Sequence, residues 1–110
     1  MNVNITSGIP GATYKVTSTD TAALAIAAAK LDDTLGRRLK ALLIENDQAT
    51  GYGLRYAFGG TSPSQTAGVA MHFLAAGSTL TVEGYSAAES LRIISATAGE
   101  HAILWITPYY

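Results

Sequence analysis

The sequence predicts an all-β protein, an antiparallel β-sandwich of jelly-roll-like or Greek-key type with at most one short helix around residues 21–30. Short runs rich in β-branched and aromatic residues recur along the chain, and polar turns that contain glycine separate them, which is typical of sandwiches and barrels. The chain has 110 residues and is 48% hydrophobic, enough for one two-layer core. No internal repeat is visible. We therefore expect residues 1–12 to form an N-terminal arm and residues 13–110 a single sandwich domain.

The first third of the chain contains one clear strand and one ambiguous segment. Glycine and proline punctuate residues 8–11, which predicts a turn or linker. Residues 13–18 alternate as a strand with Tyr14 and Val16 inward. Residues 19–35 are alanine-rich and have possible capping residues at their start, so local propensity favours a short helix. Their position between strands and their lack of large side chains leave an irregular strand as the alternative.

The remaining expected elements follow from alternation and turn chemistry. Gly84 opens a loop or a single helical turn over residues 84–90. A hairpin turn is expected at residues 98–101, joining the last two strands. The expected strands are residues 39–46, 54–58, 69–74, 78–83, 91–96 and 102–110.

The last of these strands is apolar on both faces. Successive strand side chains alternate sides, so Leu104 and Ile106 point one way while Ile103, Trp105 and Tyr109 point the other. A sheet in a small lone domain usually has one wet face. Either this strand lies in the middle of a two-layer sandwich, or its second face meets another subunit.

Composition excludes several partner classes. Charged residues make up only 14% of the chain, against roughly 25% in an average domain, which favours a protein packed against partners. The formal net charge of -1 gives no reason to expect nucleic acid or an anionic membrane as partner. There is no cysteine, no basic and apolar leader, and no apolar run long enough for a bilayer. We expect a soluble protein made in the cytoplasm.

No combination of residues indicates catalysis. His72 and His101 lack further ligands at metal-binding spacing. Asp32 and Asp33 are adjacent and would diverge on a strand or loop. No nucleophile elbow exists, and the glycines do not begin a helix after a parallel strand. The sequence therefore predicts a non-enzyme with no cofactor and no metal.

Aromatic residues are the remaining functional candidates. Tyrosine and tryptophan supply large contact area at protein interfaces, and the same residues could form a sugar-stacking platform on a β-sandwich. We favour a protein interface and keep carbohydrate binding as the alternative. The candidate interface residues are Ile103, Trp105, Tyr109, Tyr110, Tyr85 and Tyr52.

Several segments taken in order resemble the small β-sandwich virion proteins of tailed bacteriophages. They are RRLKALLIE at residues 37–45, LRYAFGGT at 54–61, SPS at 62–64, LAAGSTL at 74–80, RIIS at 92–95 and LWITPYY at 104–110. The resemblance implies a non-enzymatic structural protein of the virion, made in the host cytoplasm, most simply a capsid decoration (cement) protein. Such proteins self-associate, commonly as trimers, and bind the major capsid protein or another virion protein. A tail, baseplate or head–tail connector component is the alternative within this class.

Overall fold

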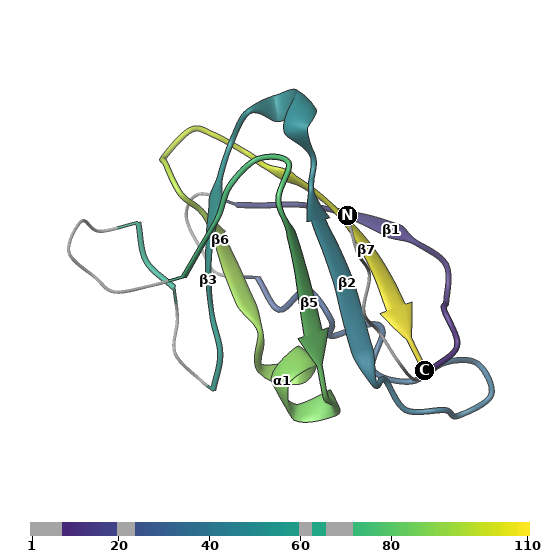
Figure 1. Ribbon diagram of the computed structural model, residues 1–110. Helices are drawn as coiled ribbons and strands as arrows, with labels where there is room; N and C mark the ends of the chain where they lie inside the picture. The colour runs from purple at the N-terminus through teal and green to yellow at the C-terminus, as the bar shows by residue number, and fades with distance from the viewer. Residues whose placement is uncertain (1–7, 20–23, 60–62, 66–71) are drawn as a thin grey trace.

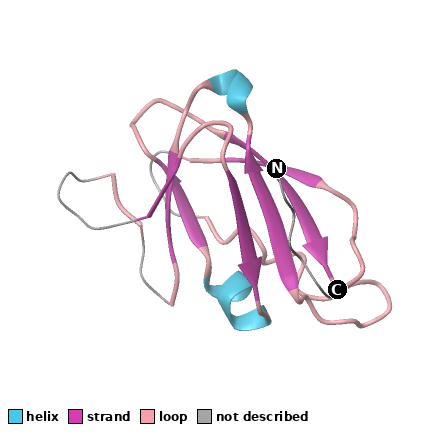
Figure 2. Cartoon of the chain, in the orientation of Figure 1, coloured by secondary structure: helices cyan, strands magenta, loops and turns pink. Residues whose placement is uncertain are grey.

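The computed structural model describes residues 8–19, 24–59, 63–65 and 72–110 of the chain. In this part, two antiparallel sheets face each other (Figure 1), which confirms the all-β sandwich. One short helix, α1 (Tyr85–Ser90), and a 3-10 turn at Gln48–Thr50 lie at opposite ends of the layers (Figure 2). The strands are β1 (Tyr14–Thr17), β2 (Ala41–Asn46), β3 (Leu54–Ala57), β4 (His72–Leu74), β5 (Thr79–Glu83), β6 (Arg92–Ser95) and β7 (Ile103–Tyr109).

Most neighbouring strands are far apart in the sequence. The larger sheet has the order β1-β7-β2-β5 and the smaller one β4-β3-β6, so only β3 and β4 are neighbours in both sequence and space. The C-terminal strand β7 lies between β1 and β2, with Ile106 opposite Tyr14 on one side and Ile44 on the other. This central position explains why one of its faces is fully apolar.

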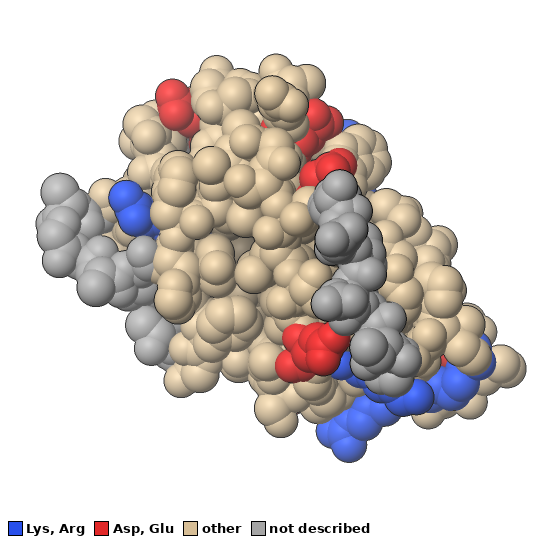
Figure 3. Space-filling model, in the orientation of Figure 1, with Lys and Arg blue, Asp and Glu red and all other residues tan. Residues whose placement is uncertain are grey.

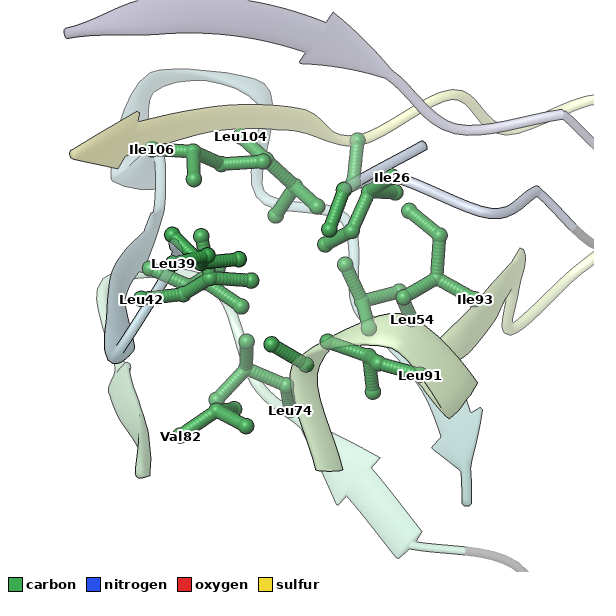
Figure 4. Close-up of a cluster of buried hydrophobic side chains, with 14 of the residues drawn as sticks. Ile26, Leu39, Leu42, Leu54, Leu74, Val82, Leu91, Ile93, Leu104 and Ile106 are labelled. Carbon is green, nitrogen blue, oxygen red and sulfur yellow. The ribbon is translucent and has the colours of Figure 1, made fainter. Parts of the chain in front are cut away.

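Side chains from both sheets meet in one hydrophobic core (Figure 4). Leu104 and Ile106 are fully buried on β7, as alternation predicts. They pack in the same cluster as Leu54 and Ile93 of the opposite sheet. Burial of one such side chain stabilises the fold by about 1.5–3 kcal/mol. The core therefore fixes which face of β7 points inward and which is left outside.

The helix expected around residues 21–30 is not formed in its described part. Residues 20–23 lie outside the described residues, and Leu24 makes a β-bridge to Ile93 through two backbone hydrogen bonds of 2.8 and 3.1 Å. Ile26 and Ala27 follow in a turn and are buried in the core. Pairing with the edge of β6 and burial of Ile26 outweigh the helix propensity of the alanines. The helix α1 lies instead where we expected a loop or a single turn.

The expected hairpin at residues 98–101 is also wrong. β6 and β7 belong to different sheets, so the intervening loop crosses from one layer to the other. Thr19 and Leu24 occupy the edge of β6 that is not paired with β3, since Ser95 N–H donates to the Thr19 carbonyl and Ile93 pairs with Leu24. With that edge occupied, β7 pairs with β1 and β2.

The predicted N-terminal arm is partly paired with β7. Ile9 and Tyr110 exchange backbone hydrogen bonds of 2.7 and 2.9 Å, and Gly11 N–H donates to the Pro108 carbonyl. Residues 8–12 thus continue the line of β1 along β7. Residues 1–7 of the predicted arm lie outside the described residues.

Candidate interaction surface

The second face of β7 is the feature on which the functional argument depends. Ile103, Thr107 and Tyr109 are half-buried there, and Trp105 is 40% exposed. The inward residues of the same strand are fully buried. Within the described part of the chain, the larger sheet has its second layer on one side only. In the described part of the chain, the apolar second face of β7 is therefore exposed to solvent and not covered by a second layer.

Cross-strand register shows which side chains share this surface. Trp105 pairs with Lys15 on β1 and with Glu45 on β2, and Glu45 pairs in turn with Thr79 on β5. Paired residues point to the same side of a sheet. We call the result the outer face. Its residues are Lys15, Thr17, Ala41, Leu43, Glu45, Thr79, Thr81, Glu83, Ile103, Trp105, Thr107 and Tyr109.

Three of the twelve residues of the outer face are charged. Lys15 and Glu45 flank Trp105, and Glu83 lies at the far edge on β5. Threonine is the most frequent residue, and two threonine hydroxyls, of Thr13 and Thr107, are hydrogen-bonded at 2.7 Å. In the space-filling view, blue side chains gather at the lower right of the molecule, and red ones lie near the top and below the middle (Figure 3).

A hydrogen bond holds the Trp105 ring in place. Its Nε1–H donates to Asp47 Oδ2 at 3.0 Å. Asp47 also accepts from the backbone N–H of Ala49 through Oδ1 at 2.9 Å, as the cap of the 3-10 turn. The hydrogen bond from Trp105, and then that from Ala49, hold the pKa of the Asp47 carboxyl below its usual range. The indole is thus fixed on the surface before any partner arrives.

Beside the Trp105 ring the outer face is hollowed. The hollow has a volume of about 220 Å³, and Leu43 supplies part of its apolar lining. Its polar groups are a carboxylate and hydroxyls, which are hydrogen-bond acceptors and donors. The lining residues are Thr13, Leu43, Glu45, Thr79, Trp105 and Thr107.

The six residues predicted from sequence as an interface do not form one patch. Ile103, Trp105 and Tyr109 share the outer face. Tyr110 is buried in the core, 7% exposed, and its hydroxyl donates to the Lys30 carbonyl at 2.9 Å. Burial, and after it the carboxylates of Asp33 and Asp32, raise the pKa of the Tyr110 phenol.

Tyr85 and Tyr52 lie at opposite ends of the sandwich (Figure 2). Tyr85 begins α1 and packs against the core, with the Arg38 guanidinium carbon 3.7 Å from its ring centroid. Tyr52 follows the 3-10 turn and is 38% exposed. Neither residue belongs to the outer face.

Sequence reasoning missed the polar neighbours of Trp105 and one further aromatic residue. Lys15, Glu45 and Asp47 surround the indole, but their proximity depends on strand pairing that no single sequence reveals. Phe73 is 53% exposed on β4, in the other sheet, with the Arg55 guanidinium 5.5 Å from its ring centroid. The alternation of β4 could have placed Phe73 outward, opposite to Leu74.

Other kinds of site find no support in the described residues. No group of three or more histidine, aspartate or glutamate side chains there is placed to hold a metal ion. His101 Nδ1 is hydrogen-bonded to the Ser18 carbonyl at 2.8 Å, and His72 stacks on Tyr56. No described helix has the length and apolar character needed to cross a membrane.

A scan against models of protein families and a search of curated proteins found no match to this chain.

Proposed function

We propose that this protein is a non-enzymatic structural component of a phage virion, a capsid decoration protein that self-associates and binds a repeating protein lattice. The observation that carries the proposal is the outer face, a sheet surface with a fixed, exposed Trp105 at its centre. The sequence resemblance to small virion proteins supports the same class. It also suggests the major capsid protein, or another virion protein, as the partner and a trimer as the oligomer.

The composition of the outer face suits contact with protein. Interface cores are poor in charge and rich in tryptophan and tyrosine, and a fixed aromatic anchor loses little side-chain entropy on binding. Burial of apolar surface there stabilises a contact by about 25 cal/mol per Å². A weak contact becomes strong when many copies meet a lattice that presents many sites, because each later contact is intramolecular.

Particle composition tests the proposal directly. Phage particles released from cells that carry this gene should contain the chain, and quantitative mass spectrometry should find it in hundreds of copies per particle. Labelling with an antibody against the chain should then decorate the head. Absence of the chain from purified particles would refute the virion proposal.

The same measurement separates the alternative within this class. A tail, baseplate or head–tail connector component would be present in tens of copies or fewer, with label confined to the tail or to one vertex. That result would retain the virion assignment and reject decoration.

Carbohydrate binding is a second candidate, favoured by the hollow beside Trp105. A flat indole next to a carboxylate and hydroxyls offers a sugar both a stacking surface and hydrogen-bond partners. Glycan-array binding that disappears in Trp105→Ala, with the fold intact by circular dichroism, would support this candidate. An array with no signal for the wild-type protein would reject it.

A further inference from the structure

We infer that the outer face pairs with the outer face of a second copy of this chain, about a two-fold axis that runs along β7. The inference rests on the proposed self-association, names the surface that it uses, and replaces the trimer suggested by the resemblance with a two-fold pair. It depends on the order of charges across the sheet, on the position of Trp105 between them and on the lack of other charged side chains on the outer face of β1, β7 and β2.

One row across the sheet carries opposite charges on either side of Trp105. Lys15 on β1 and Glu45 on β2 both pair in register with Trp105 on β7. Both charged side chains are exposed, and neither forms an ion pair with another described residue. From β1 across β7 to β2, the row therefore consists of a positive, an aromatic and a negative side chain.

This order is self-complementary under one particular rotation. A half-turn about an axis that lies along β7, between two facing copies, leaves β7 over β7 and exchanges the β1 and β2 sides. Lys15 of each copy then faces Glu45 of the other, and the two Trp105 residues meet at the axis. An isologous interface requires this kind of self-complementary patch. Two facing rows in any other relative orientation would lose one or both charge pairs.

The remaining residues of the face allow the two sheets to approach. Glu83 lies on β5, two strands from β7, so the half-turn places it beyond β1, opposite no residue of the outer face. The half-turn places Thr17 of one copy opposite the end of β2 in the other copy, near its Asp47. No like charges meet there. Most of the other contacts join threonine and aliphatic side chains, which cost little to desolvate compared with charges.

The hollow next to Trp105 provides space for the second indole. Aromatic pairs prefer an offset arrangement over a face-to-face sandwich, and the hollow lies beside the ring on the same face. The hydrogen bond to Asp47 fixes the ring before pairing. Each copy thus presents a fixed indole and, beside it, a hollow for the indole of the other copy.

The size of the face indicates a weak pair. Only β1, β7 and β2 of the two copies lie opposite one another, and three strands at a spacing of about 4.8 Å and a length of about 24 Å give roughly 350 Å² per copy. A pair would bury about 700 Å² in total, below the roughly 1,200 Å² at which stable specific interfaces begin and in the range of weak, transient contacts. We therefore expect association in the micromolar range or weaker for the isolated protein, strengthened when copies are held close on a lattice.

Charge reversal tests the pairing by sedimentation velocity over a concentration series. Lys15→Glu makes the row negative on both sides, and Glu45→Lys makes it positive on both sides. Each variant alone should associate at least about tenfold more weakly than wild type. An equimolar mixture of the two should regain association, because a doubly negative row complements a doubly positive one. The double variant, with both charges exchanged, should pair as wild type does.

Two control variants and a change of salt concentration show whether the effect is specific to the outer face. Arg55→Glu, on β3 of the smaller sheet, and Glu89→Lys, on α1, reverse charges away from the outer face and should leave association unchanged. Added salt should weaken the wild-type pair. Association that is indifferent to all of these charges would overturn the inference while leaving self-association in place.

A wild-type protein that stays monomeric at hundreds of micromolar would overturn the inference together with the proposed self-association. The sedimentation experiment uses the isolated protein without capsids. If the protein pairs in that experiment but is absent from purified particles, the virion proposal is refuted and the pairing stands.

Discussion

Two consecutive residues of β7 have opposite roles. Leu104 is fully buried in the core, whereas Trp105 is 40% exposed on the outer face. Strand alternation is the physical reason, because each residue turns the side chain to the other face. Changes at these two positions should therefore separate folding from assembly.

Leu104→Ala should lower the free energy of unfolding by about 2–5 kcal/mol, because it removes buried methyl groups and leaves a cavity. Denaturation in urea, followed by circular dichroism, measures this loss. Leu35→Ala is the matched control, since Leu35 is 76% exposed and should change stability by no more than about 0.5 kcal/mol.

Trp105→Ala should weaken self-association more than it weakens folding. Sedimentation and denaturation of the same preparation measure the two effects. A loss of folding stability as large as that of Leu104→Ala, with association unchanged, would show that Trp105 acts as an ordinary core residue.

The hydrogen bond between Trp105 and Asp47 should be visible as a pH-dependent fluorescence signal. The folded state holds the Asp47 pKa below its usual range, so this interaction stabilises the fold at neutral pH. That contribution is lost as the pH falls below about 4 and through the folded pKa. Trp105 is the only tryptophan, so its emission should change over this range.

Asp47→Asn should remove that fluorescence step, and Asp33→Asn should leave it in place. The Asp33 carboxylate is hydrogen-bonded to Arg37 and to Leu35 N–H, far along the chain from the indole. A step that persists unchanged in Asp47→Asn would refute the assignment to this hydrogen bond.

The residue-scale predictions from sequence succeeded where alternation alone decides. Alternation placed Leu104 and Ile106 on one side of the strand and Trp105 on the other, and the structure confirms this division, with Leu104 and Ile106 buried and Trp105 exposed. Pro108 also points inward, and residues two apart in a strand share a side. Alternation therefore places Tyr110 inward, and the structure shows it buried. We instead grouped Tyr110 with the interface because of its residue type. Position in the strand was the better guide.

Elements of the two sheets are joined by a buried polar contact. The hydroxyls of Ser18, at the end of β1, and Ser95, at the end of β6, are hydrogen-bonded at 2.6 Å. Ser18 Oγ also accepts from Ala102 N–H at 2.9 Å, where the chain enters β7. Both serines are almost fully buried. This contact fixes the point at which the chain crosses from one layer to the other.

Ser18→Ala should destabilise the fold more than Ser95→Ala does. Loss of the Ser18 hydroxyl leaves both the Ala102 N–H and the Ser95 hydroxyl without this partner, at about 1–3 kcal/mol for each buried group. Ser95→Ala leaves Ser18 still bonded to Ala102. Denaturation of both single variants and the double variant gives the coupling energy; equal losses in the two single variants would contradict this account.

Prediction of elements from sequence was limited by pairing. Strand positions followed from local alternation and turns, but the sheet to which each strand belongs depends on distant partners. The hairpin between β6 and β7 was expected because the two strands are close in sequence, yet the segment with Thr19 and Leu24 occupies the edge of β6. The alanine-rich helix failed for the same reason, since a tertiary pairing replaced a local preference.

At the scale of the whole molecule, the described residues form one sandwich, with the hydrophobic core on one side of the larger sheet and the outer face, with its exposed Trp105, on the other. The low charge content suggested contact with partners, and we propose the outer face as the surface of that contact. Neither the symmetry of the pairing nor the charge row could be read from sequence, because Lys15, Trp105 and Glu45 are brought together by three separate strands.

Acrylamide quenching of Trp105 fluorescence over a dilution series tests the central claim, that the outer face is an assembly contact, most directly. We predict that the quenching constant falls as the protein concentration rises through the range in which sedimentation detects association. In Lys15→Glu it should stay at the value of the dilute protein. A quenching constant that remains unchanged while the wild-type protein associates would show that assembly leaves the outer face in solvent, and would contradict the account.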